Sequence, residues 1–295
     1  MDDRSFLLRV HLCSGIGNKG EAKIYRFMQQ NKRQPQLKEL RELLSETKTN
    51  LPQFLEDFHS NKITRKIKYN QTNSNILTIL DPEYPQQLKE MFEPPLVLFY
   101  QGKVELLQKP SLAVVGARKM SSYSVSVLPP LLKDFCALQI PIVSGAAAGV
   151  DSLAHITALK QKAPTVAVIG PGLNLSYPRQ NQQLQKTMTH KGLVISEYEL
   201  DQKPLPYLFP MRNRIIAGLC LSLIVVEAKH HSGSLITANL ALQENRNVLA
   251  IPGPINHELS VGCNELIQAG AKPVLYSKDI LEDFINPLTN QSVKE

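Results

Sequence analysis

Short, continuous apolar runs alternate with longer mixed stretches from Ser111 onward. A continuous apolar run suits a strand that is buried on both faces of a parallel sheet, and most of the intervening stretches can hold the crossover helix that a parallel connection requires. The predicted strands are residues 112–115, 142–143, 165–169, 193–195, 221–226, 248–251 and 273–275. We therefore expect an α/β fold, an extended Rossmann-like domain with a doubly wound, mostly parallel sheet.

The first 60 residues follow a helical pattern instead. Apolar residues recur at helix-compatible spacing around a glycine turn at residues 14–17, and further helices are expected at 37–45 and 51–58. The pattern predicts a small all-helical domain over residues 1–60, of the sterile-alpha-motif or helix-hairpin-helix kind. In a helix-hairpin-helix, the amides of the glycine turn can touch a nucleic-acid phosphate, but a plain helix–helix turn explains the same glycines.

Polar and basic residues dominate the next segment. We expect a connector at residues 61–75, inside a linker that covers 61–80, and the Rossmann-like domain over 81–295. Basic side chains of the connector could lie along a nucleic-acid strand, although a charge run is usually a solvated face; they are Lys62, Arg65, Lys66 and Lys68. Two prolines after Glu93 exclude a helix there and lead to an apolar strand at 96–100.

The stretch 209–238 places polar residues at the end of a buried strand. After strand 221–226, two serines suited to capping a helix flank a glycine that lets the backbone come close to a ligand. The N-terminus of a helix at the carboxyl end of a strand binds anions readily, so this stretch is expected to hold a phosphate. Its candidate contacts are Arg212, Asn213, Arg214, Ser232, Gly233 and Ser234.

Two other strand ends carry candidate contacts. After the first strand of the domain, Gly116 permits a close backbone approach and Arg118 can grip phosphate oxygens with its planar guanidinium. After the third strand, Arg179 is a second basic candidate. The neighbouring Tyr177 either offers a ring on which a base stacks or packs beside Pro178.

The loop after the second strand allows an alternative, a catalytic set of Ser144, Asp151 and His155. A helix-capping role for Asp151 and a packed His155 explain these residues more simply. The sequence contains no metal-ligand spacing, no Walker-type GxxxxGK[ST] loop and no GxGxxG fingerprint. We therefore expect a basic, glycine-lined rim with no catalytic residues and no metal ion.

Composition narrows the class of partner. The chain has 295 residues and a net charge of +7, which favours a polyanionic partner. Its four cysteines are scattered without a CxxC pair, as is typical of buried thiols in a reducing compartment. No apolar run reaches membrane-spanning length and the N-terminus lacks the pattern of a signal peptide, so we expect a cytoplasmic protein with no membrane partner.

Between residues 114 and 271 a series of motifs follows in fixed order: VVGAR, SGAAAGVDSLAH, TVAVIGPGL, YPRQN, ISE, FPMRNRIIAGL, VVEA, SGSLITA, IPG and GCNELIQAGA. This series resembles the DNA processing protein A (DprA/Smf) family over the whole α/β domain. The resemblance implies a Rossmann-type domain that binds single-stranded DNA, uses no nucleotide cofactor and usually forms a homodimer. It further implies a protein that protects incoming DNA during natural transformation and loads RecA recombinase onto it.

The resemblance also assigns DNA contacts residue by residue. Basic contacts match Arg118, Arg179 and, less closely, Arg246, while the RNR run and the SGS loop match the candidates named above. Relatives commonly carry a basic residue where this chain has Ala148, so that loop would contribute backbone amides instead of a charge. The chain ends soon after a predicted helix at 279–284, which leaves no room for the C-terminal winged helix of many relatives.

One alternative is an enzyme on the same scaffold, a nucleoside-monophosphate phosphoribohydrolase. Such enzymes carry a PGGxGTxxE-type loop whose glutamate does acid–base work. The matching helix here opens SGSLITAN, and neither it nor the loop at 252–254 supplies a carboxylate. The main interpretation is a non-catalytic DNA-binding protein. If it neutralises three or four phosphates, the logarithm of its affinity should fall with the logarithm of salt concentration at a slope of roughly −2 to −3.

Overall fold

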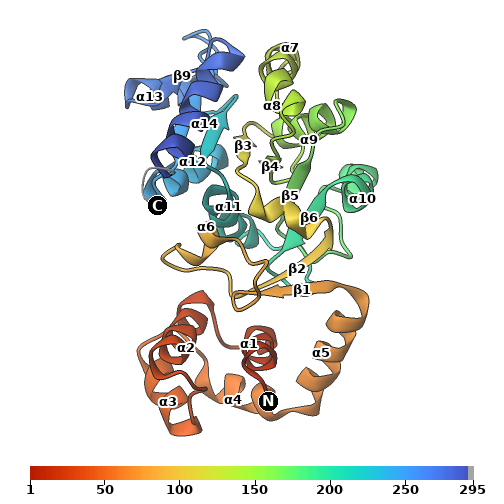
Figure 1. Cartoon of the computed structure of the whole chain (residues 1–295), viewed down its shortest axis with the longest axis vertical. Coiled ribbons are helices and arrows are strands. Elements are labelled where there is room, and N and C mark those ends of the chain that lie inside the picture. Colours follow the sequence, from red (N-terminus) through yellow and green to blue (C-terminus); the bar gives the residue numbers. More distant parts are fainter. Residues whose placement is uncertain (292–295) are drawn as a thin grey trace.

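The computed structural model describes the backbone of residues 1–291 and the side chains of residues 1–284. Its centre is a nine-stranded sheet of order β1-β2-β6-β5-β4-β3-β7-β8-β9 (Figure 1). Strands β3 to β9 all run parallel, and β2 pairs antiparallel with β1 and β6. The strands are β1 (Asn75–Thr78), β2 (Val97–Gly102), β3 (Leu112–Val115), β4 (Ile142–Ser144), β5 (Thr165–Ile169), β6 (Leu193–Ser196), β7 (Ser222–Val225), β8 (Asn247–Ala250) and β9 (Lys272–Pro273). The predicted α/β fold with a mostly parallel, doubly wound sheet is confirmed.

Helices cover both faces of the sheet. On one face pack α7 (Ser122–Leu131), α8 (Lys133–Ala137), α9 (Val150–Lys160), α10 (Gln182–Lys191) and α14 (Ser277–Gln291), and on the other pack α11 (Leu208–Leu219) and α12 (Gly233–Gln243). Side chains of β3 alternate between two hydrophobic cores, so that Leu112 and Val114 pack on the side of α7 and α9 and Ala113 and Val115 on the side of α11. Helix α13 (Val261–Gln268) lies against β8.

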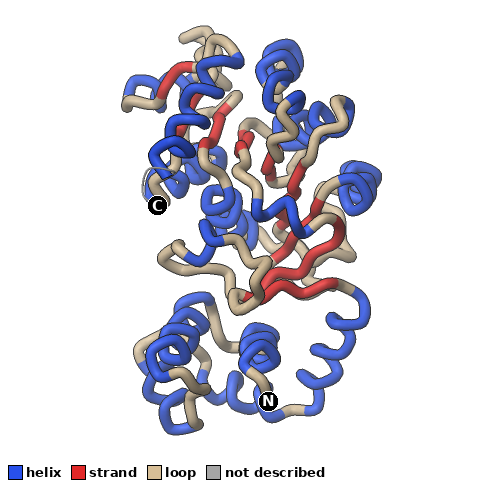
Figure 2. The backbone as a smooth tube through the Cα atoms, viewed as in Figure 1, coloured by secondary structure: helices blue, strands red, loops and turns tan. Residues whose placement is uncertain are grey.

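The N-terminal part is helical, as predicted, and Figure 2 shows it as helices and loops beside the edge of the sheet. It comprises α1 (Asp3–Leu12), α2 (Asn18–Asn31), α3 (Leu37–Ser45) and α4 (Leu51–His59). Helix α1 contacts both β1 and β2. Its buried side chains Phe6, Leu7 and Leu8 belong to the same continuous core as the residues of β1 and β2, so the bundle is packed onto the sheet.

Residues 61–80, expected as a linker, hold two regular elements instead. Helix α5 (Asn61–Asn73) begins at Ser60, whose hydroxyl accepts a hydrogen bond from the Ile63 N–H at 3.2 Å. Strand β1 then adds an edge to the sheet. The polar composition concealed the helix because α5 buries only Ile63 and Asn70 of its 13 residues. The division of the chain into domains stays a prediction.

Three short helices lie in the connections between these elements. Helix α6 (Gln86–Lys89) and the 3₁₀ helix η1 (Val104–Gln108) flank β2, and η2 (Arg179–Asn181) precedes α10. No helix within residues 1–291 is long and apolar enough to cross a membrane.

Candidate nucleic-acid interface

The carboxyl ends of the parallel strands meet at one edge of the sheet, where the strand order reverses between β3 and β7. Strands β4, β5 and β6 follow β3 outward on one side, whereas β7, β8 and β9 extend on the other. In an open α/β sheet a ligand binds in the crevice at such a switch point, because the loops that leave the two central strands diverge. The loops after β3 and β7 are two of those that the sequence singled out, and the fold places them side by side.

A cleft of about 500 Å³ lies at this switch point. Its walls come from residues 115–119, residues 229–234 and one side of α11. It is lined by seven of the predicted contact residues: Gly116, Arg118, Arg212, Asn213, Ser232, Gly233 and Ser234. It also contains Lys119, an exposed cation that sequence reasoning did not single out although it adjoins Arg118.

Aromatic rings stand beside the exposed arginine of the cleft. The Arg118 guanidinium carbon lies 5.4 Å from the ring centroid of Phe209, and the Phe209 ring lies 5.2 Å from that of Tyr177. Tyr177 is 47% exposed, so its ring is available to a base. These three side chains also line a smaller recess of about 170 Å³ that shares Arg118, Phe209 and Arg212 with the main cleft. Phe209 was missed as a contact because its apolar neighbours suggest only a helix core.

Arg179 extends the basic surface beyond Tyr177. It is exposed on the turn η2, and its guanidinium forms no hydrogen bond or ion pair recorded among residues 1–284. The turn is held by Asn181, whose amide donates to the Ala146 carbonyl at 2.9 Å and to the Ser152 hydroxyl at 2.8 Å. Arg179 is therefore placed by a braced turn next to the smaller recess.

The loop that carries Arg118 is fixed from two sides. Glu227, buried directly after β7, accepts hydrogen bonds from the Ser121 N–H at 2.8 Å, the Ser121 hydroxyl at 2.5 Å and the Ser124 hydroxyl at 2.6 Å. Gly149 has a φ of +78°, and a Cβ there would lie 2.2 Å from the Ala117 carbonyl oxygen. Only glycine fits this close approach, so the loop after β4 buttresses the Arg118 loop.

The N-terminus of α12 opens into the cleft. Ser232 is its N-cap residue, as predicted, but its side chain makes no capping hydrogen bond and lies 2.9 Å from the Ser234 hydroxyl. The first N–H groups of a helix have no intrahelical partner and carry partial positive charge. A Cβ at Gly233 would have no heavy atom within 4 Å, so the protein leaves the space above this backbone open.

Arg212 lies inside the wall of the cleft, although an exposed phosphate contact was expected. It is 4% exposed and donates hydrogen bonds to the carbonyl oxygens of Gly145 and Val168. Burial lowers its pKa to about 10, against the opposing effect of Asp151, so the group stays charged at neutral pH. Burial likewise raises the pKa of Asp151, and the Arg212 charge opposes that rise. Arg212 therefore braces the loops after β4 and β5.

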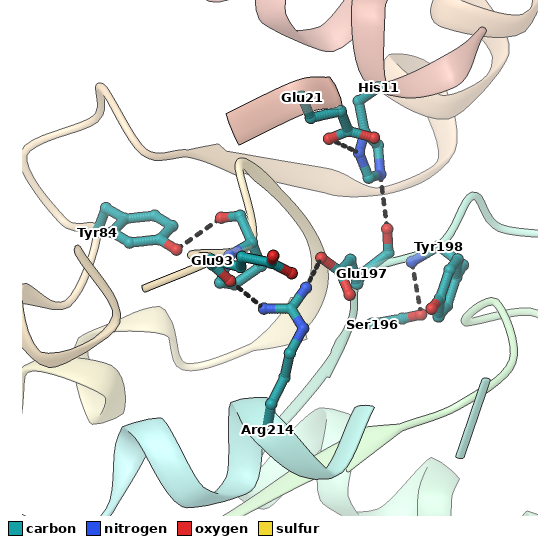
Figure 3. A network of polar contacts seen from close by, with 9 residues as sticks. His11, Glu21, Tyr84, Glu93, Ser196, Glu197, Tyr198 and Arg214 are labelled. Atoms are coloured by element: carbon teal, nitrogen blue, oxygen red, sulfur yellow. Dashed lines mark hydrogen bonds and ion pairs between the residues drawn. The ribbon is translucent and has the colours of Figure 1, made fainter. Parts of the chain in front are cut away.

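Arg214 is also buried, in a network that joins the N-terminal helices to the sheet (Figure 3). Its guanidinium pairs with the Glu197 carboxylate and donates to the Glu93 carbonyl at 2.7 Å. The Glu197 carbonyl in turn accepts a 2.7 Å hydrogen bond from His11 of α1. The structure thus gives Arg214 internal partners where the sequence suggested a phosphate contact.

Arg246 lies at the opposite edge of the sheet. It precedes β8, so it sits at the amino ends of the parallel strands, and its guanidinium donates to the Gly218 carbonyl at 3.1 Å. Arg118 and Arg179, by contrast, follow the carboxyl ends of β3 and β5. The structure therefore does not bring Arg246 into the cleft with the other candidates.

The alternative catalytic set is not assembled. The Ser144 hydroxyl donates to the Val114 carbonyl at 2.7 Å, and the ring of His155 lies 2.7 Å from the Thr165 hydroxyl. His155 is fully buried, and burial together with Arg212 lowers its pKa to about 3. The packed-histidine interpretation is confirmed. The N-cap of α9 is Gly149, and Asp151 instead accepts a 3.3 Å hydrogen bond from the Ala147 N–H. Across the described residues, no group of three or more His, Cys, Asp or Glu side chains could hold a metal ion.

Fold and cleft together define a Rossmann-like α/β protein with a basic, aromatic-flanked site at the switch point of its sheet. The model of the DNA recombination-mediator protein A family matches residues 75–285. The chain belongs to this family. The DNA processing protein DprA of Streptococcus pneumoniae is 46% identical over 207 residues, which are 70% of this chain and 73% of the relative. DprA of Bacillus subtilis is 40% identical over 217 residues, 73% of each chain.

Solved structures of relatives share the architecture. That of S. pneumoniae DNA processing protein A has a TM-score of 0.85 at 37% identity, over 96% of this chain and 98% of that chain. That of the Helicobacter pylori protein, which concerns its single-stranded DNA binding mode, has a TM-score of 0.63 at 29% identity, over 75% of this chain and 98% of that chain.

Proposed function

We propose that the cleft between the β3 and β7 loops binds single-stranded DNA, and that the protein acts by binding and not by catalysis. The observation that carries the proposal is the meeting of Arg118, Phe209 and Tyr177 with the open N-terminus of α12 at the switch point. Cations and helix N–H groups suit phosphates, and exposed rings suit unpaired bases.

The candidate residues take two roles in this proposal. Direct contacts are assigned to the accessible or partly accessible residues Gly116, Arg118, Arg179, Asn213, Ser232 and Gly233, joined by Lys119 and Tyr177, and to the more buried Ser234 at the opening of α12. Arg212 braces the wall of the cleft, Arg214 is engaged by Glu197 and Glu93 outside its lining, and Arg246 lies away from it. The structure of the family relative from H. pylori, which concerns its single-stranded DNA binding mode, supports single-stranded DNA as the ligand.

The wider role follows the family. We propose that the protein protects incoming DNA strands and loads RecA recombinase onto them in recombination and natural transformation, as a homodimer. Membership in the DNA recombination-mediator protein A family supports this role. The nucleotide-hydrolase alternative is not favoured: α12 opens without a carboxylate, and Glu227, behind the cleft, is engaged by Ser121 and Ser124.

A salt-titrated binding assay with single- and double-stranded oligonucleotides tests the proposal. Arg118→Ala and Arg179→Ala should each weaken single-strand binding and make the salt slope shallower by about 0.7, because each removes one phosphate contact. Arg41→Ala, an exposed arginine of α3, is the matched control and should change neither quantity. Equal binding of both DNA forms, unmoved by the two substitutions, would contradict the proposal, and release of base from nucleoside monophosphates would revive the hydrolase.

A further inference from the structure

A second basic cleft, of about 520 Å³, lies at the opposite edge of the sheet. Strand β2 runs antiparallel to β6, so its carboxyl end meets the amino ends of β6, β5 and β4 there. Segments adjoining these four neighbouring strands line the cleft. They contribute five basic side chains and one carboxylate: Lys103, Lys109, Lys162, His190 and Lys191, with Glu105.

Close backbone packing gathers these cations. Gly102 has a φ of +109°, and a Cβ there would lie 2.3 Å from the Gly192 carbonyl oxygen. A Cβ at Gly192 would lie 2.4 Å from the Thr165 carbonyl oxygen. Two glycines thus allow the end of β2, the turn before β6 and the start of β5 to touch, and the Lys103 N–H donates to the Gly192 carbonyl at 2.9 Å. The turn that carries Lys103 is thereby held against the turn that follows Lys191.

In the described part of the chain, the side chains of the four lysines of this cleft have no recorded intramolecular partner that would explain their positions. Lys162 and Lys191 lie at the ends of α9 and α10, where a lysine often bonds the last helix carbonyls. Among the side chains of residues 1–284, however, none of the four lysine ammonium groups has a recorded hydrogen bond or salt bridge, and all four residues are exposed. Their charges face a recess instead of a partner.

The shape of the cleft suits a linear polyanion. From β2 to β4 the sheet edge crosses three inter-strand spacings, a length of about 14 Å along which the cations are distributed. Its lining includes apolar groups, among them the buried Leu106 and Ala163, beside Leu159 and Pro164. Phosphates could pair with the lysines while sugars or bases rest on the apolar lining, as in sites that track a single strand.

We propose that this amino-edge cleft binds a second segment of single-stranded nucleic-acid backbone. The inference rests on the proposed function, since a strand held at the carboxyl edge brings further phosphates near the protein. A strand long enough to reach both edges would neutralise more charge than a short one. The amino-edge cleft would then add affinity and salt dependence for long strands alone.

The test compares Lys103→Ala/Lys191→Ala with the control Lys38→Ala/Lys48→Ala, two exposed lysines of the N-terminal part that lack recorded partners. Binding of the full chain to oligothymidines of about 8 and about 40 nucleotides is titrated with salt. The amino-edge variant should make the long-strand slope shallower by about 1.4, two phosphate contacts, and leave short-strand binding unchanged. If the double variant is less stable than the wild type, Lys109→Ala replaces it as the test, because it leaves the turn at Lys103 unchanged. This single variant should make the long-strand salt slope shallower by half as much.

Each outcome decides between distinct claims. A long-strand slope equal to that of the control would overturn the inference and leave the cleft to an acidic protein partner. An unchanged short-strand affinity in Arg118→Ala would overturn the proposed carboxyl-edge site instead. Even with that result, a shallower long-strand salt slope in the amino-edge variant, with the control unchanged, would support the second cleft.

Discussion

Arg118 and Arg212 line one cleft but differ in what their charges can do. Arg118 is exposed over the Phe209 ring, so it can turn toward a phosphate without losing an internal partner. Arg212 is buried against two carbonyl oxygens and the Asp151 charge, and its removal would leave these groups unsatisfied. Loss of Arg118 should therefore cost affinity, whereas loss of Arg212 should cost folding.

Gly233 offers a residue-scale test that separates binding from folding. A Cβ at Gly233 meets no heavy atom within 4 Å, so Gly233→Ala should leave thermal stability unchanged or slightly raised. If a phosphate approaches this backbone, the methyl group should weaken single-strand binding about 2- to 10-fold, roughly the loss of one hydrogen bond. Titration by fluorescence anisotropy measures this change.

Gly17→Ala is the matched control, because Gly17 is equally open and lies in the N-terminal glycine turn. It should bind DNA as the wild type does. A loss of affinity in Gly17→Ala with none in Gly233→Ala would move the phosphate contact to the N-terminal bundle.

At the scale of elements, the site depends on how the loop between β3 and α7 is held. Glu227 ties the start of α7 to the end of β7 through three hydrogen bonds. Gly149 ties the same loop to the start of α9. Arg118 thus stands on a loop that is anchored at both flanks, which limits the entropy lost when it binds a phosphate.

Glu227→Gln should loosen this loop without removing a cation. The amide presents a donor toward groups that donate, so the free energy of unfolding should fall by about 1–3 kcal/mol. Single-strand affinity should fall as well, but the salt slope should stay at its wild-type value because every phosphate contact remains. Urea unfolding and salt-titrated binding measure the two effects, with exposed Ser122→Ala as the control. A shallower slope in Glu227→Gln would show that the loop contributes contacts in another way.

The elements that the sequence predicted best are those buried on both faces. Strand 112–115 was predicted with its observed bounds, and strand 221–226 brackets the observed β7 because a continuous apolar run has one structural explanation in a parallel sheet. Strand β1 and helix α5 were missed, since an edge strand and a mostly solvated helix bury few side chains. Burial also limits what the sequence can predict about the site. The position of Arg118 after a strand predicted its place at the edge of the sheet, but no local pattern distinguishes this exposed arginine from the buried Arg214.

At the scale of the whole molecule, one polar network fastens the N-terminal bundle to the sheet (Figure 3). His11 contacts the Glu21 carboxylate through Nδ1 at 2.9 Å and the Glu197 carbonyl through Nε2 at 2.7 Å. Both partners are acceptors, so both ring nitrogens must donate and the ring is positively charged. Glu197 continues the network to Arg214 on α11, the helix whose first turn carries Phe209.

This network predicts how stability depends on pH. Burial alone would lower the pKa of His11, but the charges of Glu21 and Glu197 and their hydrogen bonds raise it to about 9 from 6.5. Because the folded pKa is the higher one, the stabilisation is complete below about pH 6.5 and is lost as pH rises through about 9. It amounts to about 3 kcal/mol at its maximum.

His11→Gln should therefore be less stable than the wild type at pH 6, and the difference should shrink between pH 7 and 9. Urea unfolding across this range measures it, with the exposed His257→Gln as the control. A difference that stays constant with pH would mean that His11 is not charged in the folded protein.

Ultraviolet crosslinking to oligothymidine, followed by mass spectrometry of the peptides, tests the central claim most directly. Because Tyr177 is exposed beside Phe209 at the carboxyl edge, crosslinks should map to these two rings and diminish in Arg118→Ala. Crosslinks confined to aromatic residues elsewhere, such as the exposed Tyr69 of α5, would contradict a single-strand site at the switch point.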